Sequence, residues 1–77
     1  MVSMNMNLIN LKPDEWARII AIDAGRGLRE RLQMSGISEG CSVRVVSSHG
    51  PVTLEVNRHL VSIGRGIAQK IRVVRSE

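Results

Sequence analysis

Apolar and polar residues alternate along much of the chain, in short runs separated by glycine, proline and asparagine. Val43 and Val45, for example, alternate with Ser42 and Arg44. A period of two places one set of side chains on a buried face and the other set in solvent, as in half-buried strands. The pattern predicts strands at 16–22, 41–48, 52–56, 60–63 and 70–75.

The first of these runs is rich in β-branched residues, which favour a strand. Because side chains alternate along a strand, we expect Ala17, Ile19 and Ala21 on one face and Ile22 on the opposite face. The run begins at Trp16, the only aromatic residue of the chain. With no other large ring available to fill the interior, we expect Trp16 to lie in the core.

Residues 28–34 predict a short helix. Leu28 and Leu32 stand four residues apart and therefore share one face. Gly36 ends this helix, because glycine adopts the left-handed conformation of a C-terminal cap at no steric cost. Ile37 is then placed to pack back onto Leu32, the hydrophobic contact that usually accompanies such a cap.

Turn residues separate the later strands. Residues 57–59 predict a tight hairpin, because Asn57 tolerates a positive φ. About five short strands with one short helix predict an all-β fold, and a small SH3-like β-barrel suits a chain of 77 residues. We expect a flexible tail over residues 1–7 and a single domain over residues 8–77.

The composition is basic, with eleven lysines and arginines against seven aspartates and glutamates. A basic surface suits a nucleic acid, an anionic lipid or an acidic protein. A single aromatic residue argues against single-stranded nucleic acid, which usually stacks on several rings. No apolar run reaches the roughly 20 residues that span a bilayer, so we expect no membrane-embedded segment. The lone cysteine excludes an internal disulfide and favours a reducing compartment.

Metal binding would draw on Cys41, His49 and His59, which are scattered and form no close pair of ligands. A zinc site needs three or four such ligands in one place, so we expect neither a metal site nor a bound cofactor. No nucleophile elbow and no phosphate-binding loop followed by lysine is present. The sequence therefore predicts a protein that is not an enzyme.

The order and spacing of its apolar and glycine positions resemble the FeoA family over nearly the whole chain. The matching residues are Leu8-x-x-Leu11, Ala17-x-Ile19, Arg31-Leu32-x-x-x-Gly36-Ile37-x-x-Gly40, Gly50-Pro51, Val52, Val56, Leu60 to Ile63, and Ala68-x-x-Ile71-x-Val73. The resemblance implies an SH3-like barrel in the cytoplasm. It also implies an accessory role beside FeoB, a membrane ferrous-iron transporter with a GTPase domain.

These expectations lead to a binding module of ferrous-iron uptake that acts by protein contact. We expect its partner-binding residues on the helix and the loop before it, at Arg26, Arg29, Arg31 and Met34. Arginine suits planar pairing with carboxylates, and methionine offers an adaptable apolar contact. The hairpin tip at 57–59 is the rival surface. A basic barrel associated with nucleic acid and a metal-sensing adaptor are the alternative functions, and the sequence leaves homo-oligomerisation open.

Overall fold

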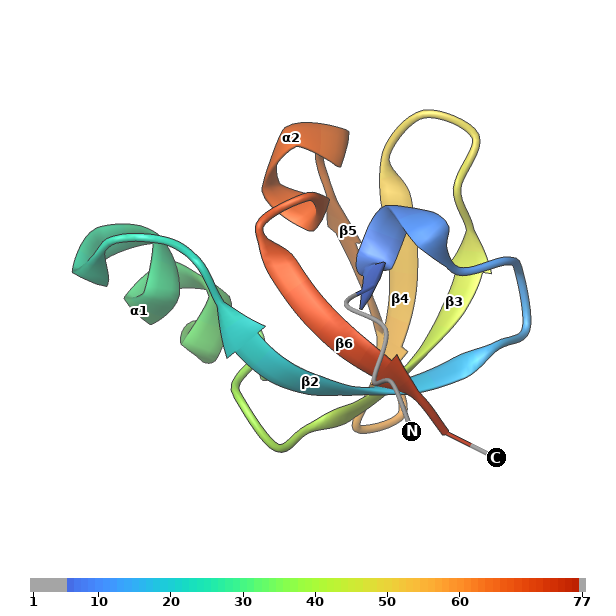
Figure 1. The fold of residues 1–77 in the computed structure, drawn as a ribbon, viewed down its shortest axis with the longest axis horizontal. Coiled ribbons are helices and arrows are strands. Elements are labelled where there is room, and N and C mark those ends of the chain that lie inside the picture. The colour runs from blue at the N-terminus through green and yellow to red at the C-terminus, as the bar shows by residue number, and fades with distance from the viewer. Residues whose placement is uncertain (1–5, 77) are drawn as a thin grey trace.

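The computed structural model describes residues 6–76 and shows one curled antiparallel sheet (Figure 1). Its six strands follow the order β1-β6-β2-β3-β4-β5. The strands are β1 (Met6–Asn7), β2 (Trp16–Ile22), β3 (Ser42–Ser47), β4 (Val52–Val56), β5 (His59–Ile63) and β6 (Ile71–Arg75). The helices are the 3₁₀ helix η1 (Leu8–Asn10), α1 (Arg26–Met34) and α2 (Arg65–Ala68).

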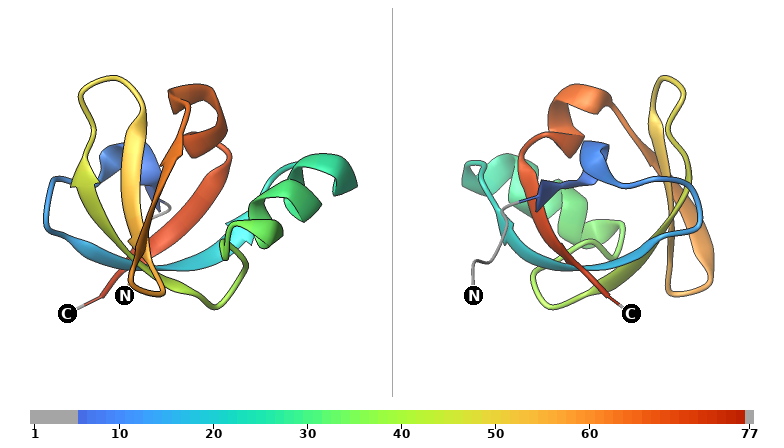
Figure 2. Two further views of the ribbon diagram at one scale, coloured as in Figure 1. Left: turned by 180° about the vertical axis from the view of Figure 1, so that it is seen from behind. Right: turned by 45° about the vertical axis from the view of Figure 1, so that its right-hand side comes forward.

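The expected fold class is confirmed, with an open edge in place of full closure. The sheet curls into a small barrel, and α2 bridges β5 and β6 at one end (Figures 1 and 2). Within residues 6–76, β1 and β5 each pair on one side only. The barrel is therefore incomplete between them, and β5 keeps one unpaired edge.

The N-terminal boundary differs from the expected tail over residues 1–7. Met6 and Asn7 form β1, which pairs with Val73 and Arg72 of β6. Two residues are too few to show a hydrophobic period, so the sequence pattern could not reveal this strand. Residues 1–5 of the expected tail lie outside the described residues.

The core is aliphatic and comes from the inward faces of the strands. The fully buried large side chains are Leu8, Ile19, Ile37, Leu54, Ile71, Val43, Val45, Val52, Val56 and Val73. Trp16 is not among them, and 46% of its surface is exposed. The expectation that it fills the core was wrong. Trp16 begins β2 on the face opposite Ala17, which is fully buried, so the ring is left outside the barrel.

Strand β2 changes its register halfway along. The pairing with β6 shifts between Ile19 and Ala21, as in a β-bulge. Beyond the shift Ile22 is buried and Ala21 is only half-buried, so the predicted faces of these two residues were wrong. A bulge moves one extra residue into the strand and inverts the alternation that follows.

Two local turns match their predicted geometry. Gly36 has φ +88°, and its N–H donates to the Gln33 carbonyl while the Ile37 N–H donates to the Leu32 carbonyl, both over 2.9 Å. These two bonds define a Schellman cap and confirm the predicted end of α1. The helix begins at Arg26, two residues before the predicted start, with Gly25 at its N-cap.

The hairpin between β4 and β5 turns over Asn57 and Arg58, which have φ values of 50° and 71°. Its tight geometry was predicted, although His59 belongs to β5 and not to the turn. Among the described residues, no helix has the length and apolar character to cross a membrane.

Candidate functional site

Helix α1 projects from one side of the barrel (Figures 1 and 2). Leu32 is buried and Leu28 is partly buried against the core, so this face anchors the helix. Met34 is 88% exposed, and Arg26 and Arg31 are also exposed. All four predicted partner-binding residues are exposed, and Arg26, Arg31 and Met34 lie outside the ion pairs of the described residues.

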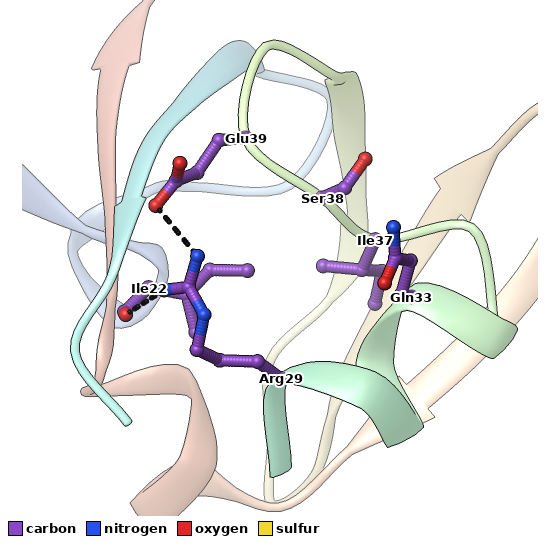
Figure 3. A pocket seen from close by; sticks show the side chains of 6 residues that line it. All are labelled: Ile22, Arg29, Gln33, Ile37, Ser38 and Glu39. Atoms are coloured by element: carbon purple, nitrogen blue, oxygen red, sulfur yellow. Dashed lines mark hydrogen bonds and ion pairs between the residues drawn. The ribbon is translucent and has the colours of Figure 1, made fainter. Parts of the chain in front are cut away.

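The fourth predicted residue, Arg29, is turned back toward the barrel (Figure 3). Its guanidinium donates to the Ile22 carbonyl oxygen over 2.7 Å and lies 3.4 Å from a Glu39 carboxylate oxygen. It thereby links α1 to the end of β2 and to the loop before β3. A pocket of about 310 Å³ opens here, lined by Ile22, Arg29, Gln33, Ile37, Ser38 and Glu39.

We predict that Arg29→Met loosens the attachment of α1 and lowers the free energy of unfolding by about 1 kcal/mol. A hydrogen bond from a charged donor contributes about 1.5–3 kcal/mol, and partial exposure of the Arg29 side chain reduces that value. Chemical denaturation measures the change. Arg26→Met is the matched control, because Arg26 is exposed and has no hydrogen bond to a described side chain or carbonyl. Equal stability of the two variants would contradict the anchoring role of Arg29.

The opposite flank of α1 faces β5 and α2 across a groove of about 230 Å³. Its lining includes Leu28, Arg31 and Leu32 on one side and Val61, Ile63 and Ile67 on the other. Ser35, Ser62 and Gly64 complete the lining, so the groove exposes polar as well as apolar surface, and Arg31 is its charged residue. At the C-terminal end of α1, a His59 ring nitrogen lies 3.3 Å from the Ser35 carbonyl oxygen, so the helix and β5 meet there.

Most acidic side chains of the described residues are already paired. The ion pairs join Arg29 to Glu39, Arg44 to Asp14 and Glu55, Arg72 to Asp23, and Arg75 to Glu15. The hydrogen bond to Glu55 is the main cause that raises the pKa of Arg44. Within residues 6–76, Glu30 is the one carboxylate outside an ion pair. The cations outside these pairs are Lys12, Arg18, Arg26, Arg31, Arg58, Arg65 and Lys70.

The candidate metal ligands Cys41, His49 and His59 do not form a cluster within residues 6–76. The Cys41 thiol is half-buried and donates to the Gly36 carbonyl oxygen over 3.2 Å, behind the cap of α1. His49 and His59 are exposed in or beside separate turns. Over residues 6–76, histidine, cysteine and acidic side chains do not gather in threes as metal ligands would.

Two features of this region had only a weak signal in the sequence. Arg29 stands three residues before Leu32, and residues at that spacing are neighbours on a helix. That spacing places Arg29 near the buried face but does not reveal the hydrogen bond of its guanidinium to the Ile22 carbonyl oxygen. The groove depends on how β5 lies beside α1, which no local pattern encodes.

Comparisons with known proteins agree with this architecture. The FeoA domain family matches residues 6–75. A protein of Methanocaldococcus jannaschii named "Putative Fe(2+) transport protein A" is 37% identical over 67 residues, which cover 86% of this chain and 82% of that protein. The crystal structure of an iron uptake regulatory protein (FeoA) superposes with a TM-score of 0.87 at 26% identity, covering 96% of this chain and 100% of the other.

The barrel also occurs inside larger proteins. The crystal structure of T. acidophilum IdeR superposes with a TM-score of 0.88 at 23% identity, and the match covers 99% of this chain but 36% of that one. At this identity the likeness concerns the fold alone. The family match over residues 6–75 and the 37% identical relative lead to one conclusion: the chain belongs to the FeoA family, whose members are involved in ferrous-iron transport.

Proposed function

We propose that this protein is a non-enzymatic accessory module of ferrous-iron uptake. It works in the cytoplasm and binds a FeoB-type membrane transporter through protein contacts. Membership of the FeoA family supports the link to iron transport. The proposal adds two points to that link: the protein contacts a transporter, and the contact lies on α1.

The observation that carries the proposal is the open face of α1. Arg26 and Arg31 lie outside any ion pair of the described residues. Arg26 begins α1, and Arg31 stands three residues before the 88% exposed Met34 at its end. Arginine binds carboxylates through two parallel hydrogen bonds, and the flexible methionine side chain adapts to an apolar neighbour. Such a face suits an acidic partner surface with an apolar centre, and it supplies binding without any reacting group.

We predict that reversing both charges, in the variant Arg26→Glu with Arg31→Glu, weakens transporter binding by about tenfold or more at low salt. Exposed charges act mainly on the association rate, and salt screens them. The measurement is binding of the full-length chain to the detergent-solubilised transporter at two salt concentrations. Because both residues are exposed, the variant should unfold at the same denaturant concentration as the parent.

The matched control is the variant Lys12→Glu with Arg18→Glu. It changes the net charge by the same amount, and both residues are exposed and outside ion pairs, but they lie on β2 and the loop before it. If both variants lose the same affinity for the transporter, the loss reflects the net charge of the protein and not a contact on α1. Loss of binding on Arg58→Glu alone would place the contact at the hairpin tip. Steeply salt-dependent binding to DNA would favour the nucleic-acid alternative.

A further inference from the structure

Strand β5 leaves a row of backbone groups without a partner strand. It pairs with β4 alone, and Val56 lies opposite His59 across the two-residue turn. A hairpin of this type makes the pair that flanks the turn a hydrogen-bonded pair, and such pairs alternate along the ladder. The N–H and C=O groups of Leu60 and Ser62 therefore point to the open side, where the described chain provides no further backbone hydrogen bond.

Strand β5 itself has none of the sequence features that block strand addition. Proteins protect exposed edges with lysine, proline, bulges or very short strands, or cover them with a helix or loop. Helix α1 meets β5 at its first residue, where His59 contacts the Ser35 carbonyl oxygen, and a groove separates the two elements beside Val61 and Ser62. Strand β5 spans five residues, contains no lysine, proline or acidic residue, and pairs with β4 without a register shift. The other end of the sheet, β1, has two residues and offers far less edge.

The unpaired edge opens directly onto the groove beside α1. Ser62 and Gly64 belong to the lining of that groove, together with the apolar residues Val61 and Ile63 of the same strand and turn. Its volume of about 230 Å³ is on the scale of one or two side chains, not of a folded element. Leu60, which is 63% exposed, adds apolar surface on the outer side of the strand.

The charges around the groove define the occupant. Arg31 lines it, and Arg26 begins the same helix. Neither arginine is in an ion pair of the described residues. Arg65 at the start of α2 does not line the groove, because its guanidinium donates to the Ser48 and Gly50 carbonyl oxygens. A second copy of the chain would bring a further net charge of +4 to the same edge, which disfavours self-pairing. An acidic segment is complementary.

We infer that the edge of β5 and the adjoining groove bind one extended segment of a partner protein, with an apolar residue flanked by acidic ones. The segment adds as a strand beside β5, accepts and donates hydrogen bonds at Leu60 and Ser62, and places its apolar side chain between Leu32 and Val61. In this mode of recognition the main-chain bonds supply affinity and the alternate side chains supply specificity. The inference rests on the proposed function for the identity of the partner, but not for the chemistry of the segment.

Ser62→Pro tests the backbone contact, because proline removes the outward N–H of Ser62 and is tolerated on an edge strand. Ser62→Ala is the matched control, since it keeps that N–H and loses only the hydroxyl. Binding of the full-length chain to the solubilised transporter should fall by about tenfold, or about 1.4 kcal/mol, in Ser62→Pro and stay within about twofold in Ser62→Ala. Amide spectra of each free variant establish that it is folded.

The second arm uses an array of seven-residue peptides with one central aliphatic residue, flanked by either glutamates or lysines. Glutamate-flanked peptides should bind and slow hydrogen exchange at the Leu60 and Ser62 amides, whereas lysine-flanked peptides should not. Transporter binding that survives Ser62→Pro but not the reversal of Arg26 and Arg31 would overturn this inference and leave the proposed function standing.

Failure of the parent chain to bind the transporter, together with peptide protection at Leu60 and Ser62, would overturn the proposed function alone. Absence of protection in every peptide would overturn the inference. Protection at these two amides that rises with the concentration of the free chain would mean that a second copy occupies the edge, which also overturns it.

Discussion

Replacing Leu32 with alanine is expected to lower the free energy of unfolding by about 2–5 kcal/mol. The side chain is 5% exposed and joins the core cluster through which α1 attaches to the barrel. Truncation removes buried methyl groups and leaves a cavity that a sheet of short strands cannot fill without moving. A domain of this size has about 5–15 kcal/mol of stability in total, so urea denaturation should show a large shift of the midpoint.

Leu60→Ala is the control for that measurement. It removes the same groups, but Leu60 is 63% exposed on β5, so the free energy of unfolding should change by no more than about 0.5 kcal/mol. Leu28→Ala should lower the free energy of unfolding by an amount between those of Leu32→Ala and Leu60→Ala, because Leu28 is only partly buried on the same face of α1. A midpoint for Leu32→Ala equal to that of Leu60→Ala would show that α1 detaches from the core without cost.

The strands with one buried face could be predicted from the sequence. Residues 52–56 alternate strictly, and the structure places β4 over the same residues with Val52, Leu54 and Val56 buried. Burial on one face is what produces a period of two, so pattern and structure share a cause. The bulge in β2 has no such signature, because it arises from pairing with β6, a strand distant in the sequence.

Trp16 shows that composition is a poor guide to which residue fills the core. Composition made it the obvious candidate for the core, yet its place in the alternation of β2 puts it opposite the buried Ala17. Aliphatic side chains from both ends of the chain fill the interior instead, among them Leu8 and Val73. The period of the strand was the better guide than the size of the residue, since a side chain cannot cross to the other face of a sheet.

On α1, too, one feature could be predicted from the sequence and another could not. Its cap could be predicted because a Schellman motif is local and needs only Gly36 and its neighbours. The expected row of four contact residues could not distinguish Arg29 from Arg31, because both are charged and two positions apart. In the structure they lie on opposite flanks: Arg29 holds the helix to β2, and Arg31 borders the groove beside β5.

Gly36→Ala is the second substitution for which we expect a large effect, a loss of about 2–5 kcal/mol in the free energy of unfolding. The left-handed conformation at φ +88° costs an alanine about 1–2 kcal/mol. The added Cβ would also lie 3.2 Å from Asn57 Nδ2 and 3.3 Å from Val56 Cγ1. Crowding of this kind adds about 1–3 kcal/mol when the neighbours cannot move freely. Urea denaturation measures the sum.

Gly40→Ala separates the two contributions. Gly40 has nearly the same conformation, with φ +90°, but a Cβ there would meet nothing within 4 Å. The free energy of unfolding of Gly40→Ala should therefore fall by the conformational cost alone, about 1–2 kcal/mol. The difference in this free energy between Gly36→Ala and Gly40→Ala then measures how closely α1 approaches the β4–β5 hairpin. Because that approach sets the distance between α1 and β5, Gly36→Ala should also slow binding of any segment to the groove, while Gly40→Ala should not. Equal losses of stability in both variants would mean that the hairpin yields to the added methyl group.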